Sequence, residues 1–160
     1  MSVELPPASD SENPFDSETA RENSCYTAYD GESLVHPAEG EDASAQAKFV
    51  HTQLRSLVLS EQFSCIGAKA AFNQNVYRFG FYRGMGDSDT VRGLARDLHT
   101  FVNEREEMSS NFTSFIASFA TPIPTSEQDF ENLVWRTLQE LHLVDAEHHD
   151  WDPEVDRDPE

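Results

Sequence analysis

The amino-acid sequence predicts one α/β (α+β) domain with a small sheet and helical crossovers. Apolar residues recur every three or four positions in several segments, which is the spacing of amphipathic helices. Two other segments alternate between inward-facing and outward-facing residues, as strands do. Because a helical segment separates these two strands, we expect them to pair in parallel through a right-handed crossover. The predicted order is helix, helix, strand, helix, strand, helix.

The first two predicted helices precede the sheet. Phe49, Leu54 and Val58 lie at helical spacing, so an amphipathic helix is expected to begin near Ala45. A short second helix follows, in which Ser64 is expected to cap the N-terminus of an alanine-rich run.

The two predicted strands cover residues 76–83 and 112–119, and a helix over residues 90–107 joins them. Ser88 or Asp89 is a suitable N-cap for this connecting helix. In the first strand, the alternation assigns Tyr77, Phe79 and Phe81 to one face and Arg78, Gly80 and Tyr82 to the other.

Ser126 is predicted to open the last helix. Asp129 follows three residues later, so the pair has the form of a capping box. The residues beyond it form one apolar stripe at helical spacing, made of Phe130, Leu133, Val134, Leu138 and Leu141.

The chain is predicted to divide into a disordered acidic leader, residues 1–44, and the N-terminal part of a single domain, residues 45–160. The leader holds eleven acidic residues and one basic residue, with few large apolar side chains. Such a composition buries too little apolar surface to offset the entropy of ordering the chain. Because two strands close a core poorly, we expect the fold to be incomplete at its C-terminus, as in a fragment, a truncated chain or a protein completed by a partner.

Composition excludes several classes of function. The formal net charge is −19 and the isoelectric point is about 4.4. Binding to nucleic acids or to anionic membranes needs a basic surface, so neither partner is expected. No apolar run approaches the roughly 20 residues of a membrane-spanning helix, and the N-terminus lacks the pattern of a secretory signal. Since Cys25 and Cys65 make no disulfide framework, we expect a cytoplasmic protein with free thiols.

Histidines and carboxylates gather near the end of the last predicted helix. They are His142, Asp145, His148, His149 and Asp150. Imidazole binds iron and other transition metals, and a nearby carboxylate can fix its tautomer. His142 and Asp145 share a helix face if the helix continues this far. The alternative, which spacing alone favours, is a helix C-terminus with histidines beside its dipole and then a solvated acidic loop.

Two further groups are candidates for a site. A Cys65 thiolate at a helix N-terminus could act as a nucleophile or an iron ligand; the alternative is a small buried core residue. Arg78 and Arg83, beside Tyr77 and Tyr82, could clamp a substrate carboxylate; the alternative is an ordinary solvated strand face. The commonest nucleotide-binding and zinc-binding motifs are absent from the sequence.

Several blocks of the sequence are similar, in this order, to the YqcI/YcgG family. They are FSCIGAKAA at 63–71, YRFG at 77–80, DLHTF at 97–101, FTSFIASF at 112–119, FENLVW at 130–135, LQELHLVD at 138–145, WDP at 151–153 and DP at 158–159. The resemblance runs from Lys48 to Glu160 and leaves the leader outside. The chain departs from the family in having Ser64 where proline usually precedes the cysteine, and family members continue into β-rich sequence.

The resemblance implies haem-dependent N-hydroxylation of a guanidine compound, arginine or a relative, with dioxygen and an electron donor as partners. Within it, we hypothesise His142 as the axial ligand and Asp145 as a support for this ligand or a contact for the substrate. Cys65, Arg83 and His148 are the other residues expected at the cofactor. Two alternative functions stay open: a non-catalytic interaction or structural protein of degenerate fold, and a thiol enzyme that uses Cys65. For the assembly, a homodimer stays open.

Overall fold

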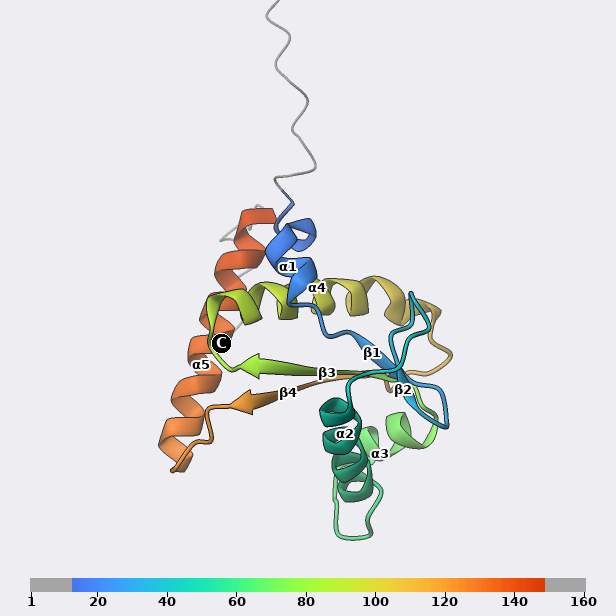
Figure 1. Ribbon diagram of the computed structural model, residues 1–160. Helices are drawn as coiled ribbons and strands as arrows, with labels where there is room; N and C mark the ends of the chain where they lie inside the picture. Colours follow the sequence, from blue (N-terminus) through green and yellow to red (C-terminus); the bar gives the residue numbers. More distant parts are fainter. Residues whose placement is uncertain (1–12, 149–160) are drawn as a thin grey trace, which may run out of the picture.

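The computed structural model describes residues 13–148 (Figure 1). The predicted α/β class is confirmed. The elements, in chain order, are η2 (Pro14–Asp16), α1 (Glu18–Glu22), β1 (Thr27–Tyr29), β2 (Leu34–Val35), α2 (Ala45–Val58), α3 (Ile66–Asn73), β3 (Tyr77–Gly84), α4 (Ser88–Glu104), η3 (Arg105–Glu107), β4 (Ser114–Thr121) and α5 (Glu127–His148).

The sheet has four strands in the order β2-β1-β3-β4. The strands β3 and β4 are parallel, as their sequence separation predicts, and Phe79 lies opposite Ile116 in their register. The strand β1 pairs with both β2 and β3 in the antiparallel sense. Helices α2 and α3 lie on one face of the sheet and α4 lies on the other, where α1 packs against α4 (Figure 1). Helix α5 packs against α4, near the carboxyl ends of β3 and β4.

The two faces of β3 separate as the alternation predicts. Tyr77 and Phe79 are buried on the side of α2 and α3. The other face is covered by α4, so the expectation of a solvated strand face is wrong. Tyr82 is buried there, and Arg78 forms an ion pair with Glu104, at 2.5 Å between Nε and Oε1.

The expectation of a disordered leader is wrong for residues 13–44. This segment contributes β1 and β2 to the sheet, and Phe15 and Ala20 are buried. Two of the four strands of the sheet therefore come from the segment that was expected to be disordered. The physical reason is that a few tertiary contacts are enough to order this segment. Phe15 packs on α4 and α5, and β1 pairs its backbone groups with those of β3. Residues 1–12 lie outside the described residues.

Helix boundaries agree with the predictions to within a few residues. Ser126 caps α5, because its hydroxyl oxygen accepts a hydrogen bond of 3.1 Å from the backbone N–H of Asp129. The N-caps of α3 and α4 are Cys65 and Asp87, each beside the residues predicted for that role. Even α5, with 22 residues, lacks the apolar character for a bilayer crossing, and the same holds for the other described helices.

Candidate functional site

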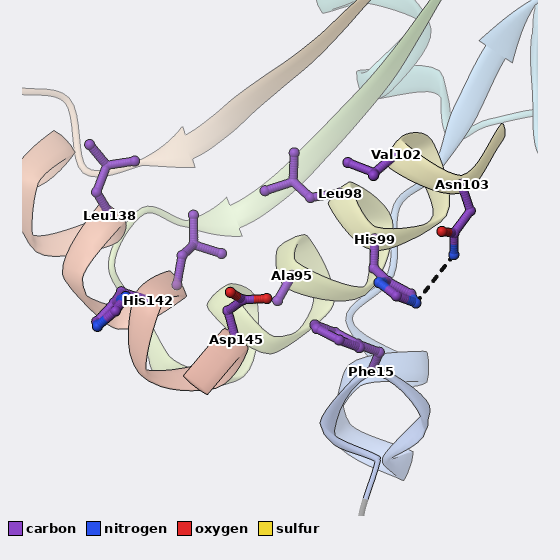
Figure 2. A pocket seen from close by; sticks show the side chains of 10 residues that line it. Phe15, Ala95, Leu98, His99, Val102, Asn103, Leu138, His142 and Asp145 are labelled. Atoms are coloured by element: carbon purple, nitrogen blue, oxygen red, sulfur yellow. Dashed lines mark hydrogen bonds between the residues drawn. The ribbon is translucent and has the colours of Figure 1, made fainter. Parts of the chain in front are cut away.

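An apolar groove of about 500 Å³ lies between α4 and α5, next to Phe15 (Figure 2). Its walls are mostly hydrocarbon, and its polar groups come from four side chains. The lining residues are Phe15, Ala95, Leu98, His99, Val102, Asn103, Leu138, Leu141, His142 and Asp145. A large apolar hollow with a few convergent polar groups is the usual form of a small-molecule site.

His142 and Asp145 reach this groove because α5 continues to His148. Residues three positions apart share one face of a helix. His142 and Asp145 therefore lie on the same face, as expected for a helix that continues this far. Between them, Val144 is buried against Phe15 and Ala95. This packing holds α5 on α4, with the His142 imidazole exposed and the Asp145 carboxylate partly buried.

The opposite wall holds His99, a residue that the sequence did not single out. Its ring stacks on Phe15 with 4.3 Å between centroids and 8° between planes. Its Nε2 lies 3.2 Å from the Asn103 amide nitrogen, one helical turn further on. Figure 2 shows His99 and His142 at opposite ends of the groove. A signal was available, because His99 lies between Leu98 and Val102 on an amphipathic helix and belongs to one of the family blocks.

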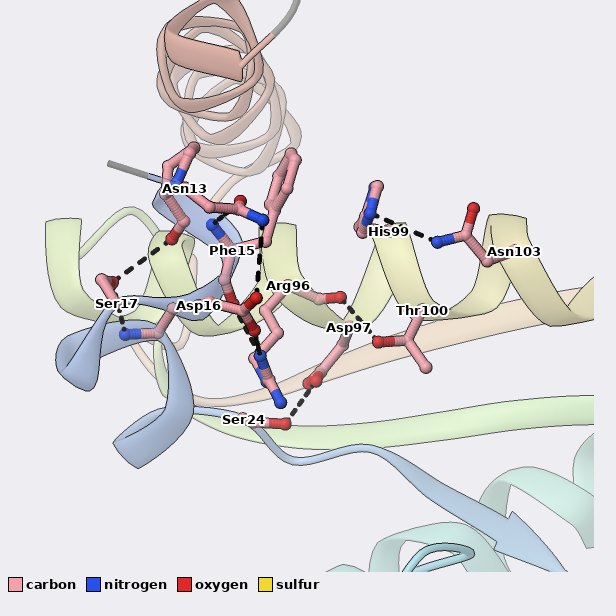
Figure 3. A network of polar contacts seen from close by, with 12 residues as sticks. Asn13, Phe15, Asp16, Ser17, Ser24, Arg96, Asp97, His99, Thr100 and Asn103 are labelled. Atoms are coloured by element: carbon pink, nitrogen blue, oxygen red, sulfur yellow. Dashed lines mark hydrogen bonds and ion pairs between the residues drawn. The ribbon is translucent and has the colours of Figure 1, made fainter. Parts of the chain in front are cut away.

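The groove depends on the N-terminal segment. Arg96 on α4 donates from Nη1 to the Phe15 carbonyl oxygen at 2.7 Å and to Asp16 Oδ1 at 2.6 Å (Figure 3). Nearby, the Ser24 hydroxyl donates to the buried Asp97 carboxylate. These bonds fix the backbone around Phe15, so its ring forms one side of the groove.

Asp145 sets the electrostatics of the groove. It is the lining side chain that carries a formal charge at neutral pH when the imidazoles are neutral. A partly buried carboxylate among apolar walls interacts more strongly with a cation than an exposed one does, because less water screens the pair. Asp145 therefore places a negative charge on the otherwise apolar wall of the groove.

The structure brings together three of the five residues expected at the site. His148 stands near the rim, where its ring meets Phe15 edge-on at 5.0 Å and His99 at 5.7 Å between centroids. Cys65 is exposed at the start of α3, across the sheet from α4, so the alternative of a buried core residue is wrong. Arg83 lines a separate polar hollow with Arg136 at the end of β3. His149 and Asp150 lie outside the described residues.

The donor set fits a haem group better than a metal held by side chains alone. Among residues 13–148, no three His, Cys, Asp or Glu side chains are grouped so as to hold a metal ion. Haem needs one axial protein ligand and a largely apolar cleft. The His142 imidazole on the wall of the apolar groove meets both requirements.

Comparison with known proteins gives one family. No curated protein and no solved structure matches the chain. The sequence profile of the YqcI/YcgG family matches residues 54–160, which is more than half of the chain. The match contains His99, His142 and Asp145, whereas Phe15 precedes it. The chain therefore belongs to the YqcI/YcgG family.

Proposed function

We propose that this chain binds haem in the groove between α4 and α5 and hydroxylates a guanidine compound there. The observation that carries the proposal is the placement of His142 and Asp145 one helical turn apart on the wall of the apolar groove between α4 and α5. Membership of the YqcI/YcgG family supports it, because the resemblance to this family implies haem-dependent N-hydroxylation of a guanidine compound.

Five of the lining residues have a role in this proposal. His142 would hold the haem iron through an imidazole nitrogen, because its exposed ring stands on the groove wall. Asp145 pairs with the guanidinium of the substrate, since a carboxylate can accept two parallel N–H bonds from that planar cation. Leu138, Leu141 and Val102 keep water from the reacting nitrogen. Haem, when bound, would supply the activation of dioxygen, of which one oxygen atom enters an N–H bond of the guanidine compound and the other leaves as water, with two electrons and two protons from the donor.

The test is an absorption spectrum of the 160-residue chain, purified from cells supplied with a haem precursor. We expect a Soret band near one haem per chain. His142→Ala should lose the band, and added imidazole should restore it by filling the vacated coordination position. Leu143→Ala is the matched control, because Leu143 is the next residue of α5 and is 60% exposed; it should keep the band.

The outcomes separate two parts of the proposal. A wild-type chain that stays colourless under these conditions would contradict haem binding. If His142→Ala keeps the full band, the ligand assignment is wrong, and His99→Ala becomes the variant to compare. Circular dichroism of each variant checks that α5 remains folded.

A non-catalytic interaction protein is the second candidate function. The observation that favours it is the uncovered edge of β4, with which no other described strand pairs beyond β3. A colourless wild-type chain together with a demonstrated partner on this edge would favour that candidate.

A further inference from the structure

The outer edge of β4 is unprotected. This strand has eight residues, and among residues 13–148 its one neighbour in the sheet is β3. None of its residues is fully buried, whereas five of the eight in β3 are. Alternate residues of an edge strand direct their N–H and C=O groups outward, which makes the edge a template for another strand. Edges that stay single are usually blunted by charged residues, proline or a bulge.

Such protective features are missing from β4. It contains no charged residue and no proline, and its register with β3 runs without an inserted residue from Tyr77 opposite Ser114 to Tyr82 opposite Phe119. The uncharged stretch continues on both sides, because no charged residue lies between Glu107 and Glu127. In a chain with 26% charged residues, this depletion is the composition of the centre of a protein interface.

Exposed apolar side chains surround the edge. Ile123, just beyond the end of the strand, is 85% exposed, and Phe112, just before it, is 53% exposed. On the face that α2 covers, Phe49 is 66% exposed beside an apolar hollow that Phe81 and Phe119 also line. We name the β4 edge together with Phe112, Ile123 and Phe49 the β4 strip.

We propose that the β4 strip joins two copies of this chain, by antiparallel pairing of one β4 with its partner. Antiparallel pairing of identical strands produces a closed two-fold dimer and one continuous sheet across both chains. The β4 strand and its flanks offer no acidic residue to a basic partner, because no charged residue lies between Glu107 and Glu127. The chain carries a net charge of −19, and the β4 strip is a neutral surface on which two such chains can meet without placing like charges together. This inference stands independently of haem binding.

The size of the strip sets the expected affinity. Eight residues of strand are about 27 Å long, and with one layer of side chains on each face the strip is about 20 Å thick. Each chain would then bury about 500 Å², or about 1,000 Å² in total, at the lower limit of specific interfaces. We therefore expect a reversible dimer with a dissociation constant in the micromolar range. Added salt should strengthen it, because it screens the repulsion between two acidic chains.

Sedimentation velocity of the full chain, from about 1 μM to about 300 μM, tests the assembly. The expected result is a shift from monomer to dimer across this range. Ile123→Glu and Phe49→Glu should each weaken the dimer at least tenfold, because each places a carboxylate within the β4 strip. Leu143→Glu adds the same charge at an exposed leucine on α5 and should leave the dimer unchanged. The exposure of all three side chains keeps the fold intact.

Hydrogen exchange identifies the face independently of mutation. Backbone amides of β4 that point away from β3 should exchange quickly in dilute protein and slowly at the highest concentration. A chain that stays monomeric throughout, in low and high salt, overturns the proposal and leaves the edge for a different protein. A dimer that tolerates both substitutions, with β4 amides unprotected, also overturns it, because the chains then meet elsewhere.

Discussion

The Tyr82 phenol donates a hydrogen bond of 2.6 Å to Oδ2 of Asp97, between β3 and α4. The same carboxylate accepts bonds from the Ser24 hydroxyl and, at 2.8 Å, from the Cys25 backbone N–H. Burial raises the pKa of the Asp97 carboxyl above its usual range, although these three donors act against the rise. One side chain thereby ties together the sheet, the helix and the N-terminal segment.

Tyr82→Phe should lower the free energy of unfolding by about 1–2 kcal/mol, because it removes one donor from a buried carboxylate and keeps the ring. Tyr29→Phe is the matched control. The Tyr29 phenol donates to the Gly31 carbonyl oxygen at the surface, so its loss should cost less than about 0.5 kcal/mol. Urea unfolding measures both. Equal effects of the two substitutions would contradict a structural role for Asp97 as the shared acceptor.

His51 should make the chain less stable in mild acid. Its ring is buried, and its Nε2 lies 2.6 Å from the Tyr77 phenol oxygen. Burial, and then the positive charge of Arg55, lower the pKa of His51 from 6.5 to about 4. The unfolded chain therefore binds more protons between these two values, so stability is lost as pH falls from 6.5 towards 4, by up to about 3 kcal/mol.

The comparison for this prediction is His51→Gln, whose side chain does not titrate. Urea midpoints measured from pH 7 to pH 4.5 should fall less steeply in the variant than in the wild type. Asp97 acts in the opposite direction, because its raised pKa favours the folded state in acid. Since both proteins contain Asp97, the difference between their slopes isolates His51. If the urea midpoint depends on pH equally in both proteins, the pKa of His51 is not lowered in the folded chain.

Gly93→Ala should destabilise the chain although alanine favours helices. A Cβ at this position of α4 would lie 2.0 Å from the backbone carbonyl oxygen of Asn23. The N-terminal segment would have to move away, at a cost of about 1–3 kcal/mol. Gly67→Ala in α3 is the control, because its Cβ would meet Phe112 at an ordinary 3.5 Å. It should be neutral or stabilising by up to about 1 kcal/mol in thermal unfolding.

Asp145→Asn should weaken the binding of a guanidine compound, if the proposed function is correct. Removing the charge from a carboxylate that pairs with a guanidinium costs about 1.5–3 kcal/mol, which corresponds to tenfold or more in affinity. Glu147→Gln is the control, because Glu147 pairs with Arg92, at 3.2 Å, and does not line the groove. Titration of the haem-loaded chain with L-arginine, followed at the Soret band, compares them. Equal affinities would remove Asp145 from the substrate site.

Much of the fold could be predicted from the sequence because its signals are local. Helical periodicity places α2, α4 and α5, alternation places β3 and β4, and the Ser126 cap is read within four residues. The helix between the two strands also determines that they are parallel. Part of the candidate site could be predicted for the same reason, because His142 and Asp145 share a face of one helix.

Tertiary structure decided what depends on residues far apart in the chain. The strands β1 and β2 have three and two residues, too few for any alternation to be visible, and they form because β3 offers them a partner. Phe15 joins the groove through packing on α4 and a bond to Arg96, eighty-one residues away. Cys65 stands apart from His142 because α3 packs on the opposite face of the sheet. By itself, the sequence determined the local elements and the family resemblance, whereas long-range packing determined which side chains meet.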